Sequence, residues 1–181
     1  MENERDAYDP LVEHDEAYFD PERPRSFDAT LLEAPAGVLQ ARRAHVLSRE
    51  DSVTDAVRAM QKEHRGVVVI TEDGTDATPV IGIFTERDVL FRIIDGGRNP
   101  ATLPLEQVMT SEPDCLGEDG TVADVLRMMS VGGFRHVPLV DEQRRPVGVV
   151  SVRDVVDLLV EAFPTEIVGR GAERQSERDG G

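Results

Sequence analysis

The chain has 181 residues, of which 36 are acidic and 20 basic, so its formal net charge is −16. This surplus of negative charge excludes nucleic acid as a general partner, because phosphate binding requires an excess of Lys and Arg, and it disfavours an anionic membrane surface. A single cysteine, Cys115, rules out an intrachain disulfide. No apolar run approaches the roughly 18 residues of a membrane helix. We therefore expect a soluble, cytoplasmic protein that binds neither nucleic acid nor membrane.

The two ends of the chain differ in composition from its middle. Residues 1–40 form an acidic N-terminal extension, in which 1–25 combine like charges with proline and favour disorder. Residues 26–40 bring enough apolar side chains to lie along the folded part. Residues 165–181 have no apolar pattern and are predicted to be a flexible tail.

Between these ends the chain repeats itself, and a repeat decides the architecture. The copies match at two places: residues 52–60 with 121–129, which lie 69 further on, and 82–89 with 148–155, which lie 66 further on. The first copy therefore carries three extra residues between these places. We assign them to a hairpin at 71–78, where an Asp-Gly pair signals a turn. The expected domains are 41–100 and 101–164.

Each copy has the same order of predicted elements. In the first copy these are an extended piece at 45–47, a helix capped by Ser52, strands at 67–70 and 80–83, and a helix from Thr85. In the second they are an extended piece at 114–116, a helix capped by Thr121, strands at 136–140 and 146–150, and a helix from Ser151. The helices show the i, i+3, i+4, i+7 spacing of one buried face. The unit is β-α-β-β-α, of the α/β class, and one copy alone cannot cover both faces of its sheet.

A Gly-x-x-Thr/Ser-x-Arg-Asp turn ends the last strand of each copy. Thr85 and Ser151 stand where this strand gives way to a helix, so free N–H groups and the helix dipole favour an anion there. Asp88 and Asp154 follow in the first helical turn, where a carboxylate can accept hydrogen bonds from the hydroxyls of a ribose. The alternative is a plain capping box with Asp in place of Glu. A single motif favours the cap, whereas its recurrence in both copies favours a ligand.

Two further motifs accompany these turns. Gln107-Val-Met-Thr110 opens the second copy, and Gly132-Gly-Phe-Arg-His-Val-Pro-Leu-Val-Asp141 lies in its middle. With the two turns, they make residues 41–164 resemble a tandem pair of CBS (cystathionine β-synthase) domains, or Bateman module. The resemblance implies two units packed through their sheets around a pseudo-twofold axis, with two clefts for adenosine-containing ligands. The ligand classes implied are AMP, ADP and ATP, with Mg²⁺ as a counter-ion, and S-adenosylmethionine or NADH as alternatives.

The resemblance also implies roles for single residues. Asp88 and Asp154 would bind ribose hydroxyls, with Thr85 and Ser151 beside the ribose or phosphate. The adenine would be flanked by backbone groups around Val46, Ser48 and Cys115, and by an apolar wall from Val137 and Pro138. Arg135 and His136 would present charge to phosphates. The first copy lacks this basic pair and the proline, and has Gly66 in place of Arg135, so the two clefts are expected to differ.

Several residues keep a simpler interpretation beside the functional one. Arg87 and Arg153 either reach a phosphate or pair with neighbouring acids. Cys115 is read as a small core residue rather than a nucleophile, because no base is placed for it. The four histidines, His14, His45, His64 and His136, show no ligand spacing with one another or with Cys115, so no metal site is expected.

We therefore expect a stand-alone regulatory module without catalytic residues, which binds an adenine nucleotide and signals to an unidentified partner or to its own oligomer. The first alternative is a scaffold with the same fold that binds no ligand. The second is a small enzyme in which Asp88 and Asp154 act as acid and base. A homodimer is expected through an apolar helix surface comprising Val89, Ile93, Leu158, Leu159 and Phe163.

Overall fold

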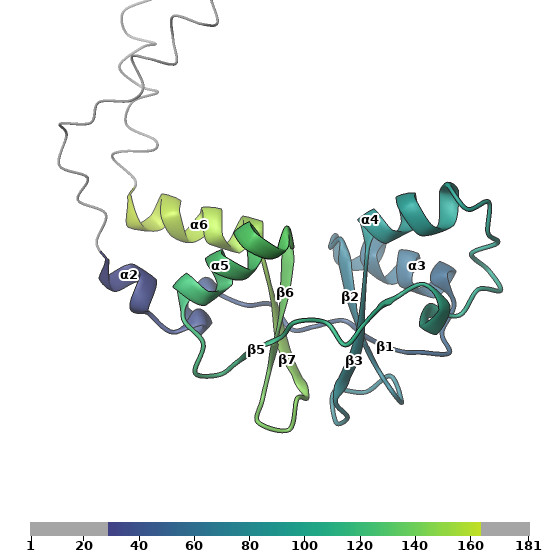
Figure 1. Ribbon diagram of the computed structural model, residues 1–181, viewed down its shortest axis with the longest axis horizontal. Helices are drawn as coiled ribbons and strands as arrows, with labels where there is room; N and C mark the ends of the chain where they lie inside the picture. Colours follow the sequence, from purple (N-terminus) through teal and green to yellow (C-terminus); the bar gives the residue numbers. More distant parts are fainter. Residues whose placement is uncertain (1–28, 164–181) are drawn as a thin grey trace, which may run out of the picture.

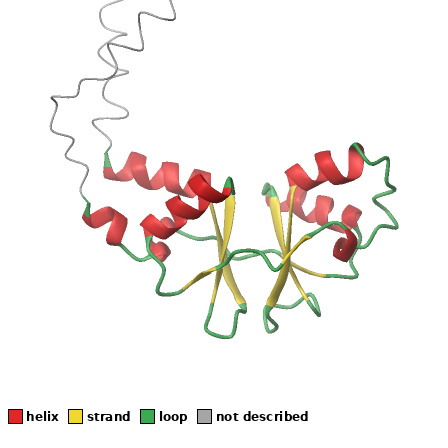
Figure 2. Ribbon diagram, viewed as in Figure 1, coloured by secondary structure: helices red, strands yellow, loops and turns green. Residues whose placement is uncertain are grey.

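The chain forms two halves that stand side by side, each with strands toward the middle and helices outside (Figures 1 and 2). The computed structural model describes residues 29–163. The arm predicted at 1–25 and the tail predicted at 165–181 lie outside this range. Within it, no helix is long and apolar enough to cross a membrane.

The first half follows the predicted order. It contains β1 (Val46–Ser48), α3 (Val53–Glu63), β2 (Val67–Thr71), β3 (Val80–Thr85) and α4 (Glu86–Asp88), which continues as the π-helical η2 (Val89–Ile94). The second half contains β5 (Leu116–Gly117), α5 (Val122–Gly132), β6 (His136–Val140), β7 (Pro146–Ser151) and α6 (Val152–Ala162). Short elements precede each half: α2 (Thr30–Glu33) and η1 (Ala36–Leu39), then η3 (Leu105–Gln107) and β4 (Thr110–Ser111). The predicted β-α-β-β-α repeat is confirmed.

The segment that leads into the other half pairs with β3 in the first sheet and, through an isolated bridge, with β7 in the second. The first sheet has the order β1-β2-β3-β4, in which β4 pairs Thr110 with Ile83. In the second sheet, β5-β6-β7, the corresponding partner of β7 is Arg42, which pairs with Val149. Arg42 and Thr110 therefore hold equivalent places in the two halves. We call residues 38–42 the lead-in segment.

Three apolar clusters form the core, one within each half and one between them. One lies under α3 and η2 in the first half, and one lies under α5 and α6 in the second, where it includes Ala36 and Leu39. The third joins the two sheets: Val67, Val69, Val80 and Ile83 of the first half meet Val140 and Val149 of the second. β2 is buried along its whole length because helices cover one of its faces and the other sheet covers the opposite face. The predicted sheet-to-sheet packing is confirmed.

The hairpins account for the three extra residues of the first half. The loop between β2 and β3 covers 72–79, against 141–145 between β6 and β7. Asp73 organises the longer loop, since its Oδ1 accepts hydrogen bonds from Thr75 N–H and from the Thr75 and Thr78 hydroxyls at 2.7–3.0 Å. Gly74 follows with φ +76°, a conformation that glycine adopts at no steric cost.

The exposed apolar helix surface differs from the one predicted. Ile93 is 4% exposed and packs in the first core, so its assignment to the surface was wrong. Ile93 lies one helical turn beyond Val89 on the face that packs against the first core, as its equivalent in α6, Leu159, packs against the second. The apolar side chains that are exposed on these helices are Leu90, Phe91 and Ile94 of η2 and Val152 and Val156 of α6.

Candidate functional site

The two predicted turns share one hydrogen-bond pattern. The Thr85 backbone N–H and hydroxyl donate to Asp88 Oδ2 at 2.8 and 2.7 Å. The Ser151 N–H and hydroxyl donate to Asp154 Oδ2, both at 2.7 Å. The capping interpretation is therefore correct as geometry in both copies. It accounts for one oxygen of each carboxylate and leaves Oδ1 to be explained.

Burial separates these two caps from the other two found in residues 29–163. Asp55 and Asp124 make the same contacts with Ser52 and Thr121, and their side chains are 49% and 37% exposed. Asp88 and Asp154 are only 12% and 8% exposed. A carboxylate withdrawn from water this far needs a cation or further donors. The helix start alone does not require that burial.

The cation differs between the two turns. Arg92, one helical turn beyond Asp88, brings its Nε to 3.1 Å from Asp88 Oδ1. Leu158 stands at the place of Arg92 in the second half, and the guanidinium near Asp154 comes from Arg42 instead, with 4.0 Å between Nε and Oδ1. That separation exceeds a hydrogen bond. Within 29–163, no hydrogen bond is made to Asp154 Oδ1, so this oxygen is available to a ligand.

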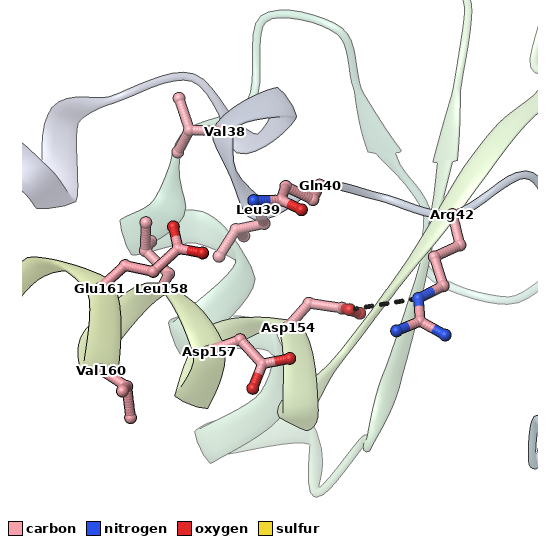
Figure 3. A pocket seen from close by; sticks show the side chains of 9 residues that line it. All are labelled: Val38, Leu39, Gln40, Arg42, Asp154, Asp157, Leu158, Val160 and Glu161. Atoms are coloured by element: carbon pink, nitrogen blue, oxygen red, sulfur yellow. Dashed lines mark ion pairs between the residues drawn. The ribbon is translucent and has the colours of Figure 1, made fainter.

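Asp154 lies in the wall of a pocket between α6 and the lead-in segment (Figure 3). The pocket has a volume of about 250 Å³ and is lined by Val38, Leu39, Gln40, Arg42, Asp154, Asp157, Leu158, Val160 and Glu161. Leu158 gives it apolar surface, while Arg42 faces the carboxylates of α6 across it. Five of the nine lining residues are polar or charged, and a concave site that combines such groups with apolar surface can hold a small molecule.

His136 lies between the turns of the two halves. It pairs with Ser151 in the sheet, and burial lowers the pKa of its imidazole, while the carboxylates of Glu86 and Asp154 act in the opposite direction. Its nearness to Glu86 brings a group of the first half close to the second turn. Arg135 accepts a hydrogen bond from the Val152 N–H through its carbonyl, and its side chain is exposed. At the matching place in the first half, the Gly66 carbonyl accepts from Glu86 N–H.

The remaining predicted site residues are not brought into this pocket. Val46 lines a separate pocket of about 510 Å³ with Arg43, His45 and Arg65, and the Ser48 N–H donates to Asp51. Val137 is fully buried in the second core, and Pro138 is buried beside it in β6. Arg87 lies over the Phe91 ring, and Arg153 pairs with Asp157. Ligand contacts for these residues stay predictions.

Cys115 packs against the cluster that joins the two sheets. Its thiol donates to the Pro113 carbonyl at 3.3 Å, and burial raises the pKa of this thiol. These observations favour the core interpretation over a nucleophile. Across 29–163, no group of three His, Cys, Asp or Glu side chains is placed to hold a metal ion.

Sequence reasoning missed the lead-in segment and Arg92. The available signal for the first was the likeness between Val38-Leu39-Gln40 and the Gln107-Val-Met-Thr110 motif, two apolar-rich stretches just ahead of each copy. The signal for Arg92 was its i, i+4 spacing from Asp88, which pairs opposite charges on a helix.

Comparison with known proteins identifies the family. The sequence model of the CBS domain matches residues 39–95 and 105–161, so the chain belongs to the CBS domain family and carries two such domains in tandem. A relative, the mitochondrial CBS domain-containing protein CBSX3 of Arabidopsis thaliana, is 30% identical over 120 residues, which are 65% of this chain and 57% of that protein. The chain thus spans little more than half of this relative's length.

Solved structures share the fold. A CBS domain protein from Pyrobaculum aerophilum, in complex with AMP, matches with a TM-score of 0.60 and 22% identity over 66% of this chain and 88% of that one. A CBS domain pair in complex with 5′-methylthioadenosine and S-adenosyl-L-methionine matches with a TM-score of 0.60 and 22% identity over 70% of this chain and 99% of that one. At this identity the likeness establishes the arrangement of the two domains.

Proposed function

We propose that this chain is a regulatory module that binds an adenosine-containing ligand, of the AMP, ADP and ATP class, in the pocket beside Asp154. The observation that carries the proposal is that the Asp154 carboxylate is buried while one of its oxygens has no hydrogen bond within residues 29–163. It is 8% exposed, its Oδ2 is engaged by Ser151, and its Oδ1 has no hydrogen bond among the described residues and lies at a pocket wall. A pair of ribose hydroxyls supplies the donors that this oxygen lacks.

The other groups of the pocket suit the rest of such a ligand. Arg42 is 52% exposed and holds Asp154 only at 4.0 Å, so it can turn toward a phosphate without giving up a hydrogen bond to that carboxylate. Leu158 offers apolar surface for a base. The volume of about 250 Å³ is just below the ~300–1,000 Å³ of drug-sized sites. It therefore suits a nucleoside whose phosphates extend toward solvent.

The family supports the ligand class. Two CBS proteins with the same fold were solved with AMP or with 5′-methylthioadenosine and S-adenosyl-L-methionine. All three compounds contain adenosine, and a site that binds ribose through Asp154 would recognise the ribose that they share. S-adenosylmethionine is therefore a test compound beside the nucleotides.

A bound ligand would signal through the connection between the two halves, because the pocket lies beside that connection. The lead-in segment packs on the second half and continues directly into β1 of the first half. A ligand held between this segment and α6 would thus act on the connection between the halves. Leu90, Phe91 and Ile94 of η2 and Val152 and Val156 of α6 are exposed, and α4 and α6 lie along the same edge of the molecule in Figure 1. We propose that a second copy covers this apolar edge in a homodimer.

Calorimetric titration with AMP, ADP, ATP and S-adenosylmethionine tests the proposal, together with thermal unfolding in each ligand. A ligand present at about 100 times its Kd should add about 2.7 kcal/mol to the free energy of unfolding. Absence of heat and of stabilisation with all four compounds would favour the ligand-free scaffold. Conversion of the nucleotide during the titration would favour the enzyme.

A further inference from the structure

Arg92 makes three contacts in the first half that have no counterpart in the second. Its Nε lies 3.1 Å from Asp88 Oδ1, its Nη2 donates to the Thr110 hydroxyl at 3.0 Å, and its Nη1 donates to the Val108 carbonyl. One guanidinium thus joins the helix after the first turn to the segment that precedes β5. Asp88 has both oxygens engaged as a result, since Thr85 already occupies Oδ2.

The contacts of Arg92 correspond to the walls of the pocket beside Asp154. Thr110 pairs with Ile83 as Arg42 pairs with Val149, so Thr110 holds the place of Arg42. Val108 ends the helical turn of η3 and is buried, as Leu39 is at the end of η1. Arg92 itself holds the place of Leu158. Arg42, Leu39 and Leu158 all line the pocket, so Arg92 spans the equivalent space in the first half.

We propose that Arg92 closes the first cleft by occupying the ligand's place on Asp88, so that the chain binds one adenosine-containing ligand and not two. The proposal rests on the function proposed for the second cleft. A ligand at Asp88 would have to displace a charge pair and two hydrogen bonds, whereas at Asp154 it meets an unengaged oxygen. Charge-assisted hydrogen bonds are among the strongest in proteins, and this set is held within one chain at no cost of association. Arg92 is thus the residue that makes the two clefts unequal.

The decisive variant gives the first cleft the pattern of the second. Arg92→Leu with Thr110→Arg copies Leu158 and Arg42 onto their equivalent places and leaves the net charge unchanged. Calorimetric titration with AMP should show one site per chain in the wild type and two in the double variant. Arg92→Leu alone should also gain a site, and Arg58→Leu, which removes an exposed arginine of the same half, should keep one. Circular dichroism and melting temperature establish that each variant is folded.

The reciprocal change supplies a second test. Leu158→Arg places a guanidinium one helical turn beyond Asp154 and should abolish AMP binding in an otherwise wild-type chain. Two sites in the wild type would overturn the inference, as would a folded double variant without a new site. AMP binding retained by a folded Leu158→Arg chain would overturn it as well. If the wild type binds no AMP and the double variant binds one, the proposed function at Asp154 fails while the closure of the first cleft stands.

Discussion

Replacing Asp154 with alanine separates the two functions that its turn can have. As a cap, the carboxylate accepts from the Ser151 N–H and hydroxyl, and its loss should cost about 0.5–2 kcal/mol of stability. As a ligand group, it would lose charge-assisted hydrogen bonds of about 1.5–3 kcal/mol, which weakens binding by roughly ten- to more than a hundred-fold. The pair with Arg42 adds little, because the groups are 4.0 Å apart and the arginine is half exposed.

Asp124→Ala is the matched control. Asp124 makes the same cap with Thr121 in the same half, but it is 37% exposed and does not line the pocket. Both variants should lose a similar few degrees of melting temperature, since 1 kcal/mol shifts a chain of this size by about 2–4 °C. Only Asp154→Ala should weaken AMP binding in calorimetry. Unchanged affinity in Asp154→Ala, or an equal loss in Asp124→Ala, would refute the ligand role of Asp154.

Further predictions concern assembly, backbone strain and pH. Light scattering at micromolar concentration should show a dimer, and a Phe91→Glu, Ile94→Glu double variant should be a monomer, because these side chains are 65% and 66% exposed at the proposed interface. A monomeric wild type would contradict this. In urea unfolding, Gly74→Ala should destabilise more than Gly97→Ala, since both have positive φ but only at Gly74 would a Cβ come within 3.0 Å of backbone. Burial depresses the pKa of His136 in the folded state below the ordinary value of 6.5. The free energy of unfolding should therefore fall as the pH drops from about 6.5 through the folded-state pKa of His136. His136→Gln should flatten this decline, and an unchanged slope would contradict the assignment.

The architecture could be predicted from the sequence because the β-α-β-β-α pattern occurs in it twice. A single apolar run such as 67–70 does not distinguish a strand from part of a helix, but two runs at matching places between capped helices do. The three-residue difference in offset predicts a longer hairpin at 71–78, and in the structure its loop covers 72–79. Local signals did not show which apolar side chains of η2 face outward: Ile93 packs in the core, whereas Leu90, Phe91 and Ile94 are exposed.

The candidate site could be predicted only as far as local motifs reach. Asp154 and Ser151 stand three residues apart, so their contact follows from the chain itself. Arg42 lies more than a hundred residues from Asp154 and meets it because the lead-in segment pairs with β7, a pairing that crosses from one half to the other. No periodicity within one copy encodes that crossing. The roles of Val46 and Ser48 follow from the resemblance alone and stay predictions, since Val46 lines a pocket separate from the one beside Asp154.

The two turns share a motif and differ in the origin of the compensating charge. At Asp88 the guanidinium comes from the next turn of the same helix, so this pair does not depend on how the halves are joined. At Asp154 it comes from the segment that runs on into the first half, so the pair depends on how the halves are joined. A ligand that engages Asp154 and draws Arg42 toward its phosphates therefore acts on that connection directly. A ligand at Asp88 would meet a charge pair internal to one helix, and the duplicated site would signal from one side only.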